Sequence, residues 1–159
     1  MCILFRGTGH TGYRVIEMMT DEQLLTSMLH TVQMGQTGIR SVMAKAIGPE
    51  LKAELKAQLK EYDSLEKQTL SMASHKGLEL KDLNPALESM SCMMSKVQLM
   101  GGEVDSRIAG MLIQGNTRGM ILGIKNLRKA SKADPQVQEL AHKLLNRENM
   151  NIQKSQQFL

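Results

Sequence analysis

Three glycines at four-residue intervals within a helical pattern constrain this chain more than any other feature. Gly115, Gly119 and Gly123 stand in the run GMLIQGNTRGMILGIKNLRK. Residues four apart lie on one face of an α-helix, and each glycine costs about 1 kcal/mol of helix propensity relative to alanine. A helix sustains that loss where another helix must approach very closely. The glycine ladder therefore predicts a tightly packed helical bundle.

The composition agrees with a helical fold that has an aliphatic core. The chain has 159 residues, with 14 Met, two Tyr, two Phe and no Trp. That length predicts one domain. Aromatic residues, which strands favour, are scarce, and methionine fills irregular gaps between helices. We therefore expect an all-α protein.

Charge and hydropathy exclude several classes of protein. No apolar run reaches the roughly 18 residues of a membrane span, and Asn116 and Arg118 interrupt the glycine-rich stretch. The net charge is only +4, and the near absence of stacking aromatics argues against nucleic-acid binding. Two cysteines, Cys2 and Cys92, form no disulfide framework, which fits a cytoplasmic location.

Residues 1–18 differ from the rest of the chain. They contain three glycines and no helical period. Thr20 and Gln23 then have the spacing of a capping box, which predicts a helix start. We favour a start-site artefact, with translation beginning at Met18 or Met19, and the alternative is a genuine flexible arm. The expected domain is 19–159.

Apolar periodicity predicts four long helices and a shorter one. Gly-Pro and Asp-Pro pairs bound several of them, because proline suits a first helical turn. A short helix between the second and third long ones fits a four-helix topology with one crossover. The expected fold is a four-helix bundle with an extra crossover helix. The ranges are 21–47, 49–76, 84–100, 105–131 and 135 to near the C-terminus.

Several polar residues occupy positions where the helical spacing calls for apolar ones. A buried carboxylate is unfavourable unless it is paired or coordinated, so Glu148, at the spacing of Leu144 and Ile152, stands out. We expect the other polar residues to form a buried hydrogen-bond network, which can fix helix register. They are Gln33, Gln36, Gln58, Tyr62, Gln114 and Asn151.

Three sequence runs carry a resemblance to a known superfamily. LKAQLKEYDSLEKQ, IAGMLIQGNTRGMI and LAHKLLNRENMNIQ resemble the ferritin-like superfamily. More narrowly, they look like a small uncharacterised family of spore-forming bacteria that is distantly similar to spore-coat-type proteins. The resemblance covers roughly residues 20–159. It implies a ferritin-like bundle, an association with spores, and a second copy or another coat-type protein as partner.

Members of that superfamily with two metal ions use Glu-x-x-His motifs that this chain lacks. Asn151 and Ser64 stand three residues after Glu148 and Glu61, where histidine would be. Amides, poor ligands for iron or manganese, stand where other acids would be. The alternative functional hypothesis is therefore a metal-binding or redox protein with a degenerate iron or manganese site at Glu148 and Glu61. The favoured one is a non-enzymatic structural or interaction protein with no catalytic or cofactor-binding residues.

A third reading is a weak binder of anionic partners. It rests on basic residues near the end of the glycine-rich helix and in the last helix. Such binding is electrostatic and weakens steeply with salt. The residues are Lys125, Arg128, Lys129, Lys132 and Lys143.

Overall fold

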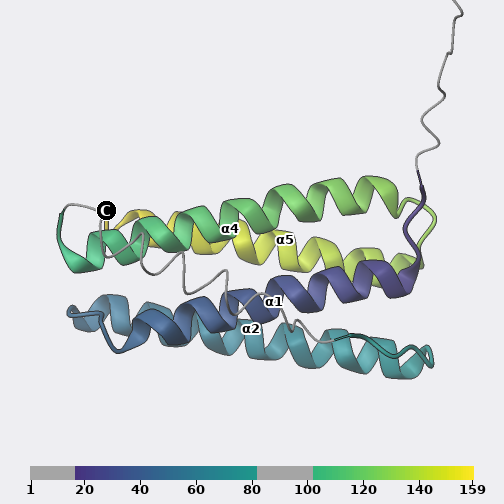
Figure 1. Cartoon of the computed structure of the whole chain (residues 1–159), viewed down its shortest axis with the longest axis horizontal. Coiled ribbons are helices and arrows are strands. Elements are labelled where there is room, and N and C mark those ends of the chain that lie inside the picture. The colour runs from purple at the N-terminus through teal and green to yellow at the C-terminus, as the bar shows by residue number, and fades with distance from the viewer. Residues whose placement is uncertain (1–16, 82–101) are drawn as a thin grey trace, which may run out of the picture.

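Four long helices make up the described part of the protein (Figure 1). The computed structural model describes residues 17–81 and 102–159. No regular structure other than helix occurs in these ranges, so the predicted all-α four-helix bundle is confirmed. The helices are α1 (Asp21–Met43), α2 (Pro49–His75), α4 (Val104–Lys129) and α5 (Pro135–Gln156).

Two of the sequence-based predictions fall outside the described residues. They are the short helix expected at 84–100 and the arm or start-site artefact expected before residue 17. Within the described ranges, no helix has an apolar stretch long enough to cross a membrane.

The helices pair as two antiparallel hairpins, α1 with α2 and α4 with α5 (Figure 1). Met19 N, just before α1, donates to Lys129 O at the end of α4 (3.0 Å). The start of α1 therefore lies beside the end of α4. The end of α2 lies at this same end of the bundle, close to the starts of α1 and α5. The start of α4 lies at the other end.

Local signals in the sequence fix several helix ends. The Thr20 hydroxyl accepts from Gln23 N (3.2 Å), and the Gln23 side chain accepts from Thr20 N (2.9 Å), so the predicted capping box is confirmed. Gly77 follows α2 with a φ of +67°, a left-handed conformation that favours glycine. Proline occupies the first turn of α2 and of α5.

Asp105 binds a turn that is distant in sequence. It lies in the first turn of α4, and its carboxylate accepts from Ile47 N (2.8 Å) and Gly48 N (2.7 Å). Gly48 is the N-cap of α2, so Asp105 joins the start of α4 to the α1–α2 turn. This turn also explains why α1 ends at Met43 rather than at Ile47.

Charged side chains fasten the opposite end of the bundle. Lys76 Nζ lies 3.0 Å from Asp21 Oδ2 and 2.7 Å from Asp134 Oδ2. Asp21 Oδ1 also accepts from Asp134 N (2.9 Å). The hydrogen bonds to Asp134 and Asp21 raise the pKa of Lys76. The cluster links the end of α2 to the starts of α1 and α5.

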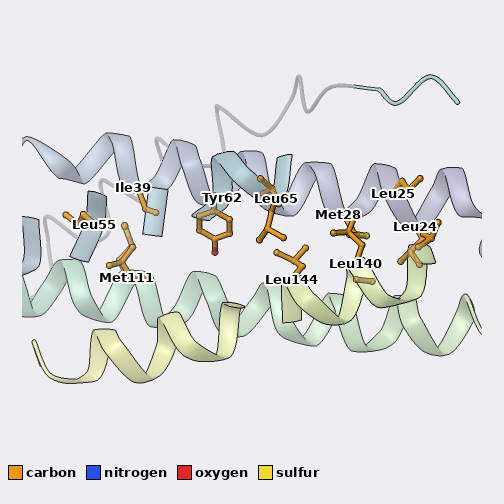
Figure 2. Packing of buried hydrophobic residues seen from close by; sticks show 14 of the residues in the cluster. Leu24, Leu25, Met28, Ile39, Leu55, Tyr62, Leu65, Met111, Leu140 and Leu144 are labelled. Carbon is orange, nitrogen blue, oxygen red and sulfur yellow. The ribbon is translucent and has the colours of Figure 1, made fainter. Parts of the chain in front are cut away.

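Between these two ends the core is a long row of aliphatic side chains interrupted by one tyrosine. Figure 2 shows Tyr62 within the row, with its hydroxyl directed towards the α4–α5 hairpin. Its exposed fraction is only 2%. A buried hydroxyl needs a hydrogen-bond partner. We therefore expect buried polar groups beside the Tyr62 hydroxyl.

We predict that Asp105→Ala lowers the free energy of unfolding by about 1–2 kcal/mol, because two backbone N–H groups lose their acceptor. Urea denaturation measures the change. Glu103→Ala is the control, since Glu103 is an exposed acid at the same helix start with no capping bond. Equal stability losses in the two variants would contradict the bridging role of Asp105.

Candidate functional site: a buried carboxyl beside a cavity

Glu148 lies in the middle of the bundle, on the inner face of α5. Its exposed fraction is 2%. Tyr62 Oη, from α2, is 3.1 Å from Glu148 Oε1 and 2.9 Å from Asn116 Oδ1 on α4. Asn151 Nδ2 also donates to Asn116 Oδ1 (3.3 Å), and Asn116 Nδ2 donates to Leu112 O (2.7 Å). Three helices therefore meet at one buried polar group.

Two glycines make room for these side chains. A Cβ on Gly119 of α4 would overlap Glu148 Oε2, and a Cβ on Gly35 of α1 would lie 2.6 Å from the Tyr62 ring. No larger residue fits either position unless the buried side chain moves. Close packing at Gly119 is therefore against a carboxyl group.

The glycine ladder divides into three different environments. Gly119 faces Glu148, and a Cβ on Gly123 would lie 2.7 Å from Leu145 Cδ2. A Cβ on Gly115, by contrast, would have no heavy atom of residues 17–81 and 102–159 within 4 Å. Close contact therefore explains two of the three glycines, and Gly115 faces open space.

That open space is a cavity of about 150 Å³ between α1 and α4. Gly35 and Gly38 line it from α1, and Gly115 and Gly119 line it from α4. Glu148 contributes to its wall, and within the described part of the chain Glu148 Oε2 has no hydrogen-bond partner. The cavity therefore has a mostly apolar wall with a buried carboxyl oxygen.

Burial raises the pKa of Glu148 to about 8, although the hydrogen bond with Tyr62 lowers it in part. Burial, and then the charge of Glu148, raise the pKa of Tyr62 well above its ordinary value. At pH 7 the carboxyl is therefore mainly protonated. A protonated Glu148 can donate to Tyr62 Oη, and Tyr62 can then donate to Asn116. Each hydroxyl proton in this series of hydrogen bonds, from Glu148 through Tyr62 to Asn116, then has an acceptor.

The predicted polar residues separate into distinct groups. Tyr62 and Asn151 belong to the Glu148 cluster. Buried Gln36 instead donates to Asp63 (2.9 Å) and Glu66 (2.8 Å), which joins α1 to α2. Half-buried Gln33 donates to Glu66 (3.3 Å) in the same group.

Two further amides lie apart from both groups. Buried Gln58 donates to Glu54 (3.0 Å) and lies 3.5 Å from Ser155, at the α2–α5 contact. Gln114 is exposed on α4, outside any buried network. The single network expected from the sequence is thus several local ones.

The two residues of the predicted metal site, Glu61 and Glu148, have different surroundings and different partners. Glu61 pairs with Arg147 (3.0 Å), and its side chain is 46% exposed, whereas Glu148 faces Tyr62 in the core. Among residues 17–81 and 102–159, no three His, Cys, Asp or Glu residues gather as a metal ligand set.

Sequence reasoning missed two residues of this site, Asn116 and Gly35. Asn116 was considered only as an interruption of an apolar run. Its signal is its place on the inward stripe, four residues after Leu112. Gly35 stands on the buried stripe of its own helix, where a glycine indicates close approach by a neighbour.

The fold is shared with solved structures of two bacterial proteins. The conserved hypothetical protein rv2844 from Mycobacterium tuberculosis aligns with a TM-score of 0.66 at 12% identity, over 87% of this chain and 96% of that chain. A DUF305 fragment from Deinococcus radiodurans aligns with a TM-score of 0.69 at 10% identity, over 86% and 93%. No family model and no curated protein matches the chain. These similarities show a common helical fold and no activity.

We predict opposite effects for alanine at two rungs of the glycine ladder. Gly119→Ala lowers the free energy of unfolding by about 1–3 kcal/mol, because its Cβ displaces Glu148. Gly115→Ala raises it by about 0.5–1 kcal/mol, since alanine has the higher helix propensity and meets nothing. Urea denaturation of both variants tests this. A loss of stability in both would mean that Gly115 is also closely packed.

We predict that stability falls as the pH rises from about 4.5 to about 8. In this window the unfolded chain loses the Glu148 proton while the folded protein keeps it, which disfavours folding by about 1.4 kcal/mol per pH unit. Glu148→Gln mimics the protonated acid, so it removes this contribution and exceeds the natural protein in stability at pH 8. Thermal unfolding at pH 5 and pH 8 measures both, and parallel pH profiles would contradict a buried neutral carboxyl.

Proposed function

We propose that this protein is a non-enzymatic interaction protein that docks through the outer face of α4 onto an acidic protein partner. Binding rather than catalysis is supported by the way the core polar groups hydrogen-bond to one another. Tyr62, Asn116, Asn151 and Glu148 hold three helices together. The surface of α4 supplies the second part of the argument.

After its first turn, which contains Asp105, α4 carries only positive charges, and so does the turn that follows it. Residues 106–133 contain six Lys or Arg residues and no Asp or Glu. Four of the six are exposed near the end of the helix and in the turn after it. A surface of one sign attracts partners of the opposite sign. These exposed cations are Lys125, Arg128, Lys129 and Lys132.

Apolar side chains are exposed next to these cations. Ile121 and Ile124 have exposed fractions of 49% and 41%, and their spacing puts them on the same side of the helix as Lys125 and Arg128. Single exposed apolar residues are common, but a cluster marks an interaction surface. Together, cations and apolar groups favour a partner that is acidic and partly apolar. This pairing is the observation that carries the proposal.

The partners expected from the sequence were a second copy or another coat-type protein. Two copies that met through α4 would bring like charges together, which is unfavourable. We therefore favour a different, acidic protein at this face. Self-association, spore association and ferritin-like ancestry stay predictions.

We predict that Lys125→Glu/Arg128→Glu weakens binding to a fluorescent amphipathic helical peptide of Glu and Leu at least tenfold. The natural protein should itself bind more weakly as salt rises from about 50 to about 200 mM, since exposed charges are screened. Fluorescence anisotropy measures both effects. Lys52→Glu/Lys56→Glu, with the same charge change on exposed positions of α2, is the control and should bind like the natural protein.

An equal loss in the control pair, or no binding at all, would overturn the proposal. Anionic phospholipid vesicles form a second arm. If they bind in a way that depends on Lys125 and Arg128 while the peptide does not, the face is a membrane-binding surface instead. Sedimentation velocity on the same samples reports self-association independently.

A further inference from the structure

We propose that the cavity between α1 and α4 is a binding site for a small, neutral, largely apolar molecule with one hydroxyl group, an alcohol or a phenol. Three features of the cavity point to such a ligand: its glycine-lined walls, its volume and the unpaired oxygen of the neutral Glu148 carboxyl. This proposal is independent of the partner proposed for α4.

The walls are built so that the space stays open. Four glycines from two facing helices line the cavity, although glycine weakens a helix. Gly35 and Gly119 are needed for Tyr62 and Glu148. Gly115 is not needed for packing among the described residues, because a Cβ there would touch none of their atoms within 4 Å. A glycine at this position instead keeps the cavity free of side chains.

The size of the cavity sets the size of its ligand. Its volume is about 150 Å³, and a cavity of about that volume in another protein binds benzene. Met111, Leu112 and Ile39 give this one an apolar lining. The ligand therefore has the size of a single aromatic ring or a short branched chain.

One polar atom in the wall selects the chemistry of the ligand. Glu148 Oε2 has no hydrogen-bond partner in the described part of the chain, although the residue is almost fully buried. An unpaired buried acceptor is unfavourable, and a ligand that donates a hydrogen bond relieves it. A single hydroxyl group meets this requirement without adding a second buried polar atom.

The surrounding charges favour a neutral ligand. The raised pKa of Glu148 leaves the carboxyl mainly protonated at pH 7, so it offers little charge to an ammonium ion. The mostly apolar lining also disfavours burial of an ammonium ion. Three other polar residues of the lining have partners within the protein: Tyr62 is hydrogen-bonded to Asn116, and Thr31 donates to Ser27 O.

The test compares three ligands of similar shape with the natural protein: benzyl alcohol, toluene and benzylamine. Titrations at pH 7 followed by two-dimensional NMR measure each Kd. We expect benzyl alcohol to bind at least tenfold more tightly than either of the others. In Glu148→Met the cavity remains but the acceptor is gone, so toluene should bind at least as well as benzyl alcohol.

Filling the cavity provides a second variant. Gly115→Leu should abolish saturable binding, because its side chain enters the open space. Gly110→Leu is the matched control, since a Cβ on Gly110 also meets no atom of the described part of the chain within 4 Å, and Gly110 does not line the cavity. It should bind benzyl alcohol like the natural protein. Circular dichroism verifies that both variants are helical.

Three results would overturn the proposal. Benzyl alcohol that binds no better than toluene would show that Glu148 Oε2 does not select the ligand. Tighter binding of benzylamine would show that the site takes cations. Absence of saturable binding of benzyl alcohol by the natural protein, or equal binding by Gly115→Leu, would show that the cavity is not the site.

Discussion

The burial of one carboxyl group at the centre of the bundle constrains the positions of all four helices. Glu148 can face the interior only where α4 presents no side chain, at Gly119. Tyr62, which contacts Glu148, can reach it only where α1 has Gly35. The spacing between the helices is therefore set by a polar pair and two glycines, and the aliphatic core packs around them.

The two ends of the bundle use different chemistry to hold the same alignment. At one end, the Asp105 carboxylate binds backbone N–H groups of the α1–α2 turn. At the other end, Lys76 lies between two aspartates from the starts of α1 and α5. Between these ends the core side chains are mainly apolar, and apolar contacts alone are compatible with several alignments of the helices along one another. Polar contacts at the ends and centre are thus what select one alignment.

Helix existence was predictable from the sequence because helix ends carry local signals, such as Thr20 with Gln23. The burial of Glu148 was predictable because its position on the apolar stripe directs its side chain towards the core. The partners of Asp105 and Gly119 were not predictable. A local pattern assigns an aspartate to its own helix, and it cannot show the rotation of a neighbouring helix. That rotation decides whether a glycine meets a side chain, as at Gly119, or empty space, as at Gly115.

The fastening of both bundle ends has a consequence for the chain's connectivity. Each hairpin carries, within its own helices and turns, the groups that align it with the other: Asp105 opposite the α1–α2 turn, and Lys76 opposite Asp134. Within the described residues, the two hairpins are therefore held in register by their own contacts at both ends of the bundle. Expressed as two separate fragments, they would carry the groups needed to reassemble into one bundle.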